Sequence, residues 1–486
     1  MGLKNNIFKS GIYLFIARGF DKLTSLISIL ILARLLEPSE FGLIALALIV
    51  VSVLESITAI SLETAIINKK EINRHDLDVA WTYGRVLRSL MIASIVILLS
   101  PFIANFFEEP RLEFILQVMM LGQILNGFQN IGMILYIKNL DFQKDFYLSI
   151  ISRILRIFVL IFSAFYFKSV WAFVFAYLAM CFSSAFLSYY LHPFRPNLNF
   201  NTKILKDLFS FGGWVFLSQL TISINGIIDR SFIGRIMTAT FLGYYQIAFR
   251  FGHELPNEMK SVINQVMFPF YSIRKDDLLN IKKNFLFVFK TTSFIIFPTL
   301  TMVYLLSDYL VILLLGNKWT LAIPPLKILA FVALFQSLTS SSFPLLKGLG
   351  FPRYETYLTG IMLITSTVLM YPLISNYGIN GAAMALLFGQ IITFPFFLHL
   401  IKKATNINAF EILKCLLKPI LLSIFLVFLS YFVQWFNKFE VDWNTLIQIL
   451  SSLTLFSISS YFFLLKINKD EEIETIHNFI YSYFKN

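Results

Sequence analysis

Long apolar runs separated by short polar breaks dominate this chain. Runs of about twenty residues, the length that crosses a hydrocarbon layer of roughly 30 Å, recur from residue 11 to residue 466. The predicted spans are 11–34, 41–65, 80–107, 112–137, 146–166, 170–191, 207–232, 241–268, 284–306, 322–346, 356–374, 380–401, 415–436 and 444–465. Each must be a helix, because a backbone in lipid has to satisfy its hydrogen bonds within its own segment. The pattern predicts an all-α membrane protein with about 14 transmembrane helices.

Composition agrees with a lipid environment. Hydrophobic residues make up 57% of the 486 positions and charged residues 14%, against roughly 25% charged in an ordinary soluble domain. The two cysteines, Cys181 and Cys415, both lie in apolar runs. They form neither a disulfide framework nor a metal-ligand pattern. We therefore expect no metal and no cofactor.

The basic residues indicate the orientation in the membrane. When alternate loops are assigned to opposite sides, 22 of the 40 lysines and arginines fall on the side of the N-terminus and five on the other. Positive residues accumulate in the cytoplasm, so both termini are predicted to be cytoplasmic. The net charge of +12 sits in short loops instead of on a soluble surface, which argues against a nucleic-acid partner.

A weak internal repeat predicts two lobes. Residues 11–47 align with residues 212–248 at a constant offset of 201, which pairs Phe41 and Gly42 with Leu242 and Gly243. Six spans separate the copies, so the repeat is parallel. We expect an N-terminal six-helix lobe (1–200), a C-terminal six-helix lobe (201–405), two additional transmembrane helices (406–466) and a cytoplasmic tail (467–486). Two facing lobes suit transport by alternating access.

The spans carry 13 basic and eight acidic residues, a net charge of +5. Charged side chains deep in a membrane are costly and usually mark a pathway for a substrate or an ion. Three helices of the first lobe each carry two deep cations three or four residues apart, and hence on one face. These are Arg18 with Lys22, Arg85 with Arg88, and Arg153 with Arg156. If the faces converge they form a cationic cavity for an anionic cargo.

Structural pairing is the alternative for each of these cations. Asp21 lies beside Lys22 and three residues after Arg18, so it could neutralise either. In the second lobe Arg250 is followed four residues later by Glu254, and this pairing is as plausible as a contact with cargo. Arg230 lies near the end of its predicted span, where it could snorkel to the interface.

Three acidic residues are candidates for ion coupling: Glu55, Asp229 and Glu254. Each could equally be a hydrogen-bonded structural carboxylate. Enzyme signatures are missing, since no phosphate-binding loop and no metal-spaced histidines or cysteines occur. The breaks between spans are too short for a catalytic domain, so the chain is not expected to be an enzyme.

Four segments resemble the bacterial polysaccharide flippases, the Wzx-type oligosaccharide flippases and polysaccharide exporters of the multidrug, oligosaccharidyl-lipid and polysaccharide superfamily. They are LARLLEPSEFGLIA (32–45), IDRSFIGR (228–235), LGYYQIAFR (242–250) and LGNKWTLAIPPLKILA (315–330). The likeness covers roughly residues 1 to 400.

The resemblance implies a multi-pass protein of the bacterial inner membrane that flips undecaprenyl-diphosphate-linked oligosaccharides by ion-coupled alternating access. The product would be O-antigen, capsule or exopolysaccharide, and a polymerase and glycosyltransferases would be partner enzymes. The cationic residues expected to bind substrate are Arg18, Lys22, Arg88, Arg153, Arg156 and Arg250. A multidrug exporter of the same superfamily and, with less support, a membrane-embedded polysaccharide polymerase remain alternatives.

Overall fold

The computed structural model describes residues 2–58, 71–139, 141–202, 223–254, 278–436 and 441–451, together with a few single positions between these ranges. The chain divides into two compact units. The first comprises Met1–Gln246 with Ile374–Ile379, and the second comprises Ile247–Leu373 with Asn380–Asn486. The predicted lobe boundary at residue 200 stays a prediction.

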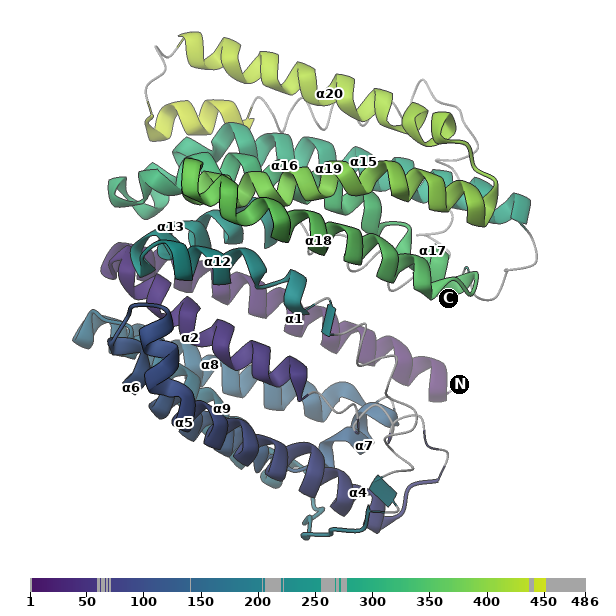
Figure 1. The fold of residues 1–486 in the computed structure, drawn as a ribbon. Coiled ribbons are helices and arrows are strands. Elements are labelled where there is room, and N and C mark those ends of the chain that lie inside the picture. The colour runs from purple at the N-terminus through teal and green to yellow at the C-terminus, as the bar shows by residue number, and fades with distance from the viewer. Residues whose placement is uncertain are drawn as a thin grey trace. The chain divides into compact units, whose positions relative to one another are not determined.

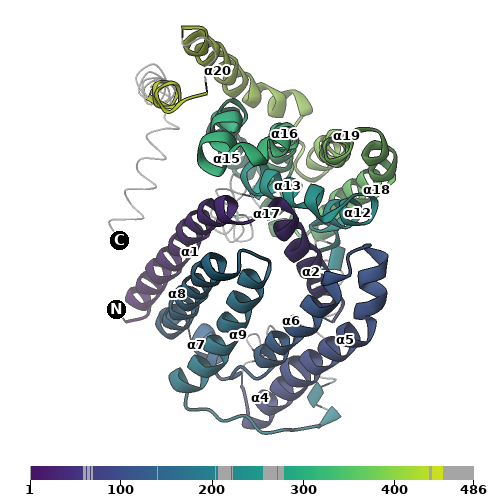
Figure 2. The same ribbon diagram turned by 90° about the vertical axis from the view of Figure 1, so that its left-hand side faces the viewer.

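The regular elements in the described part of the first unit are helices (Figure 1). Its elements are α1 (Gly2–Leu35), α2 (Pro38–Ile57), α4 (Arg74–Trp81), η1 (Thr82–Leu87), α5 (Arg88–Phe106), α6 (Arg111–Gly127), α7 (Met133–Lys138), α8 (Phe142–Phe167), α9 (Trp171–Leu191), α12 (Ile228–Ile236) and most of α13 (Ala239–Phe249). α8 packs between α1 and α9, and α6 packs between α9 and α5 (Figure 2). α2 contacts α5, α6 and α12.

The elements of the second unit in its described part are also helices. They are η2 (Arg250–Glu254), α15 (Leu278–Tyr309), η3 (Leu310–Leu315), η4 (Asn317–Ala322), α16 (Ile323–Ser340), α17 (Phe343–Gly348), α18 (Pro352–Tyr377, apart from its last turn), α19 (Ile379–Thr405) and α20 (Ala409–Phe436). Phe285, Phe289 and Phe397 are almost fully buried in its core, where α15 meets α19. α15 also packs against α16 and α20.

Nine helical segments within the described ranges are long and apolar enough to cross a membrane. They are Pro38–Ile57, Arg74–Phe106, Phe142–Phe167, Trp171–Leu191, Leu279–Leu315, Asn317–Gly348, Pro352–Tyr377, Ile379–Thr405 and Ala409–Trp435. Each overlaps one predicted span, which confirms a multi-pass helical membrane protein. Most of spans 207–232 and 444–465, and nearly half of span 241–268, lies outside the described residues. The count of fourteen and the cytoplasmic termini therefore stay predictions.

The predicted span 112–137 is two helices instead of one, because the chain breaks between Gly127 and Met133. The buried Asn130 side chain holds the break: its amide donates to the carbonyl oxygens of His192 (3.3 Å) and Phe194 (2.6 Å). Burial lowers the pKa of His192, and nearby Arg195 lowers it further. The neutral ring accepts a hydrogen bond from the Phe194 N–H at 3.0 Å.

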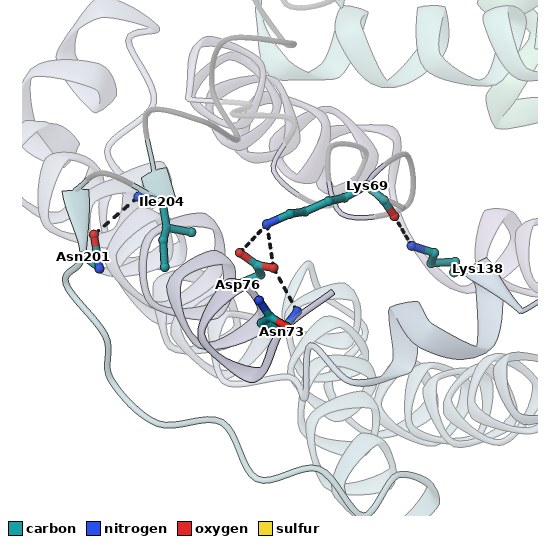
Figure 3. Close-up of polar contacts among 6 residues, drawn as sticks. All are labelled: Lys69, Asn73, Asp76, Lys138, Asn201 and Ile204. Atoms are coloured by element: carbon teal, nitrogen blue, oxygen red, sulfur yellow. Dashed lines mark hydrogen bonds and ion pairs between the residues drawn. The ribbon is translucent and has the colours of Figure 1, made fainter. Parts of the chain in front are cut away.

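Hydrogen bonds tie several segments together at the end of the first unit where α4 begins (Figure 3). The Asp76 carboxylate accepts hydrogen bonds from the Lys69 ammonium at 2.7 Å and from the Asn73 N–H at 3.0 Å, and Lys138 donates to the Lys69 carbonyl. The extended segment after α9 lies along the same helix, since Asp78 accepts from the Asn197 N–H at 2.9 Å. This segment is thus fixed to the first unit.

A buried carboxylate in the first turn of α2 joins three helices. Glu40 accepts a hydrogen bond from the Arg111 guanidinium at 2.8 Å, at the start of α6. Its second oxygen accepts from the Val170 N–H at 2.6 Å, at the start of α9. A carboxylate at a helix N-terminus is favoured by the backbone dipole. The side chain therefore fixes α2, α6 and α9 relative to one another.

α2 and α13 cross with their backbones in contact. A Cβ on Gly42 would lie 1.6 Å from the Ala239 carbonyl oxygen, and a Cβ on Gly243 would lie 1.8 Å from the Pro38 carbonyl oxygen. The contact is reciprocal, because the first carbonyl of each helix faces the glycine of the other. The offset of 201 pairs Gly42 with Gly243 and Pro38 with Ala239. This is the contact that a two-fold repeat would produce.

We predict that Gly42→Ala destabilises the protein by about 3 kcal/mol or more, because backbone atoms have little room to yield to an added methyl group. Gly360→Ala in α18 is the matched control, since a Cβ there meets nothing within 4 Å. It should leave stability unchanged or raise it slightly. Thermal unfolding of both purified variants in detergent measures the difference. Equal melting temperatures would show that the crossing tolerates a side chain.

Candidate functional site

Two of the predicted cationic faces lie on helices that pack against each other. α1 and α8 are in contact, and the Arg153 guanidinium of α8 forms an ion pair with the Asp21 carboxylate of α1 at 3.2 Å. Lys22 follows Asp21, and Arg156 lies one turn beyond Arg153 and is exposed. The ion-pair partner of Asp21 is thus a cation of another helix. The spacing in the sequence had predicted a partner within the same helix, Lys22 or Arg18.

Arg18 lies within α1, but its side chain falls outside the part that the structure describes. Its role in binding substrate stays a prediction.

The third cationic face has a structural partner at the end of α2. Arg88 donates one hydrogen bond to the Glu55 carbonyl oxygen at 2.9 Å and another to the Thr58 hydroxyl at 3.2 Å. A cation at a helix C-terminus satisfies carbonyl groups that lack helical partners and interacts favourably with the dipole. Arg85 donates to the Gln129 side-chain oxygen at 3.0 Å. Both arginines therefore help to fix the surroundings of Glu55 and Gln129.

A cavity of about 440 Å³ lies inside the first unit next to these residues. Its walls come from α2, α6, α9, α12 and α13. The polar and charged side chains among its lining residues are Ser52, Glu55, Asn126, Gln129, Tyr177, Ser184, Arg230 and Gln246. Lys22, Arg153 and Arg156 do not line it. The cavity and the cationic faces of α1 and α8 are therefore made by different side chains.

Two of the three candidate coupling carboxylates lie at or near this cavity. Glu55 lines it, and within the described part of the chain no basic side chain comes within 4.0 Å of its carboxylate. Asp229 is fully buried: it accepts a hydrogen bond from the Tyr245 hydroxyl at 2.8 Å and lies 3.7 Å from the guanidinium Nε of Arg230. Asp229 thus has the surroundings of a structural carboxylate, whereas Glu55 faces open space.

The third candidate belongs to a separate pair in the second unit. Arg250 forms an ion pair with Glu254 at 3.0 Å within η2, a short π-helical turn. Gly252 lies in the same turn, where a Cβ would approach the Leu326 carbonyl oxygen to 2.7 Å. Spacing alone suggested this pair. Cargo binding by Arg250 and ion coupling by Glu254 both stay predictions.

The side chains of the cavity were largely invisible in the sequence. Arg230 lies near the end of a predicted span and was expected to snorkel, but its side chain is only 15% exposed and faces the cavity beside Asp229. Arg230 lies in one of the four segments that resemble the flippases, and this position is the one feature of the sequence that could have indicated a functional role. Asn126 and Gln246 are neutral, so a search for charged residues within the spans does not find them. Within the described residues no cluster of three histidine, cysteine or acidic side chains could hold a metal ion.

Comparison with known proteins supplies the family. Residues 31–324 match the model of a family described as polysaccharide biosynthesis protein. The chain belongs to this family. It is 24% identical over 314 residues to the lipopolysaccharide biosynthesis protein WzxC of Escherichia coli strain K12, and the match covers 64% of each chain. It is 21% identical over 361 residues to the teichuronic acid biosynthesis protein TuaB of Bacillus subtilis strain 168, covering 74% of each.

This member of the polysaccharide biosynthesis protein family has the fold of a solved membrane transporter. The lipid II flippase MurJ in an inward closed conformation superposes with a TM-score of 0.74 at 16% sequence identity, covering 95% of this chain and 99% of MurJ. The all-α fold predicted from the apolar pattern is therefore the fold that MurJ has. The family predicted from the four segments is confirmed.

We predict that Tyr245→Phe destabilises the first unit by about 1 to 3 kcal/mol, because Asp229 is fully buried and loses its hydroxyl donor. Tyr83→Phe is the matched control, since the Tyr83 hydroxyl donates to the Phe200 carbonyl at an exposed position. Chemical or thermal unfolding of the purified variants compares the two. A larger loss in Tyr83→Phe would contradict a structural role for the Tyr245 hydroxyl.

Proposed function

We propose that this protein moves undecaprenyl-diphosphate-linked oligosaccharides from the cytoplasmic to the periplasmic leaflet of a bacterial inner membrane. The transported units would be assembled into O-antigen, capsule or exopolysaccharide by glycosyltransferases and a polymerase. Fourteen spans with both termini in the cytoplasm would place the two lobes for ion-coupled alternating access. Family membership carries the proposal, and the fold shared with MurJ supports it.

The cationic faces of α1 and α8 suit a diphosphate. Lys22, Arg153 and Arg156 lie on two packed helices in a chain whose spans carry more basic than acidic residues. A planar guanidinium binds two phosphate oxygens at once, which makes arginine well suited to this group. Asp21 forms an ion pair with Arg153, and Arg156 lies one turn further along α8 at an exposed position. An exporter of cationic drugs would be expected to carry the opposite charge on these faces.

We predict that Arg156→Ala abolishes surface polysaccharide in a strain that depends on this gene, while the protein still inserts normally. Arg353→Ala, which removes an exposed cation at the start of α18, should have no effect. Surface polysaccharide is measured by gel analysis of cell extracts, and insertion by the amount of protein in membranes. Normal export by Arg156→Ala would contradict the proposed cationic binding face.

The Asp21–Arg153 pair allows a sharper test of whether Arg153 also binds cargo. If Arg153 serves only to neutralise Asp21, then Asp21→Asn should restore export to Arg153→Ala. If Arg153 contacts the diphosphate, the double variant should stay inactive although the unpaired carboxylate charge of Asp21 is gone. We expect the double variant to stay inactive, and recovery of export would assign Arg153 a purely structural role.

Ion coupling is proposed to reside at Glu55. It lines the cavity, and Arg88 bonds to its backbone carbonyl and not to its carboxylate, whereas Asp229 and Glu254 each have an arginine beside the carboxylate. A carboxylate facing a wet cavity inside a membrane is a typical proton or cation site.

We predict that Glu55→Gln removes the dependence of transport on an imposed proton or sodium gradient. Transport is measured in proteoliposomes with and without each gradient, and Glu254→Gln is the comparison variant. A Glu55→Gln protein that still responds to the gradient like the wild type would exclude Glu55 as the coupling residue.

A further inference from the structure

The cavity in the first unit is lined by more neutral hydrogen-bonding groups than charged ones. Side-chain amides reach it from α6, from the break that follows α6, and from α13: Asn126, Gln129 and Gln246. Ser52 of α2 and Ser184 of α9 add hydroxyl groups. Such groups recognise hydroxyls and amides through direction and spacing, and they give little selectivity for phosphate.

Two hydrogen-bond acceptors on the wall of this cavity could bind donor groups of a ligand. The side-chain oxygen of Gln246 is buried, and the described residues offer it no donor. The Glu55 carboxylate, also on the wall, accepts hydrogen bonds only. A buried acceptor left without a donor costs roughly 1 to 3 kcal/mol. A ligand with several O–H groups would supply the donors that both acceptors lack.

The charges around the cavity favour a neutral ligand over a cationic one. Arg230 is part of the wall, and Arg85 and Arg88 lie just behind it through their bonds to Gln129 and to the backbone of Glu55. Three guanidinium groups would repel an organic cation large enough to fill the cavity, whereas a proton taken up by Glu55 would only neutralise its carboxylate. The volume of about 440 Å³ lies within the range of roughly 300 to 1,000 Å³ that is typical of small-molecule sites.

From these features we infer that the cavity binds a sugar unit of the cargo through its hydroxyl groups, with Gln246 and Glu55 as acceptors and Asn126 and Arg230 as donors. This inference rests on the proposed function and assigns the saccharide its own site within the first unit. The diphosphate would be bound by other side chains, those of α1 and α8. The protein would then recognise the sugar as well as its lipid carrier.

Two lipid probes separate the sugar site from the diphosphate site. The full-length protein in lipid nanodiscs is titrated with undecaprenyl diphosphate and with undecaprenyl diphosphate that carries one hexose. We expect the wild type to bind the sugar-bearing probe at least fivefold more tightly. Gln246→Leu should reduce this advantage to less than twofold and leave the Kd for the bare diphosphate unchanged. Gln434→Leu in α20, outside the cavity, should keep the full advantage.

If Gln246→Leu lowers the yield of folded protein, Gln246→Asn is the second variant. Its side chain is one methylene group shorter, so the amide oxygen lies further from the ligand. The preference for the sugar-bearing probe should then lie between those of the wild type and Gln246→Leu. An advantage that survives in both Gln246 variants, or equal binding of both probes by the wild type, would overturn the sugar site and leave the proposed function standing. A wild type that binds neither lipid would contradict the proposed function itself. Sugar-independent binding of tetraphenylphosphonium that is lost in Glu55→Gln would make the cavity a cation site and overturn the inference.

Discussion

The backbone contact between α2 and α13 constrains everything built around it. Gly42 and Gly243 bring the first carbonyl of each helix against the other helix, and no larger side chain fits at either position. Helices in lipid gain little from hydrophobic burial against one another, so close approach through small residues is a main source of their packing energy. α2 carries the Glu55 side of the cavity and α13 carries Gln246. The crossing therefore sets the distance between the two acceptors on which the sugar site depends.

The same unit shows how charges are accommodated in an apolar environment. Glu40 and Asp229 are both buried. Glu40 accepts hydrogen bonds from Arg111 and from the Val170 N–H, and Asp229 accepts one from Tyr245 and lies 3.7 Å from the Arg230 guanidinium. A buried carboxylate with fixed donors organises the helices around it and exchanges protons or ions poorly. Glu55 differs from these two carboxylates, because it lines the cavity.

The apolar pattern was sufficient to predict the fold class, and four short segments were sufficient to predict the family. The offset of 201 aligned Gly42 with Gly243, but only coordinates could show that these glycines meet the opposite helices. Spacing along one helix predicted the ion pair of Arg250 and Glu254, because both residues lie on the same face. It could not predict the ion pair of Asp21 and Arg153, because that contact depends on the packing of α1 against α8. The cavity was beyond the sequence for a related reason: Asn126, Gln129 and Gln246 are uncharged residues from distant segments, and nothing in their local pattern marks them.

The central claim is that this chain transfers lipid-linked saccharide between leaflets. The most direct measurement reconstitutes the purified protein in liposomes that hold undecaprenyl-diphosphate-linked oligosaccharide in one leaflet, and follows the sugar with a membrane-impermeant lectin at the other surface. The account predicts transfer that requires the protein and is faster with an ion gradient. No transfer above protein-free liposomes, by protein shown to be folded, would contradict it.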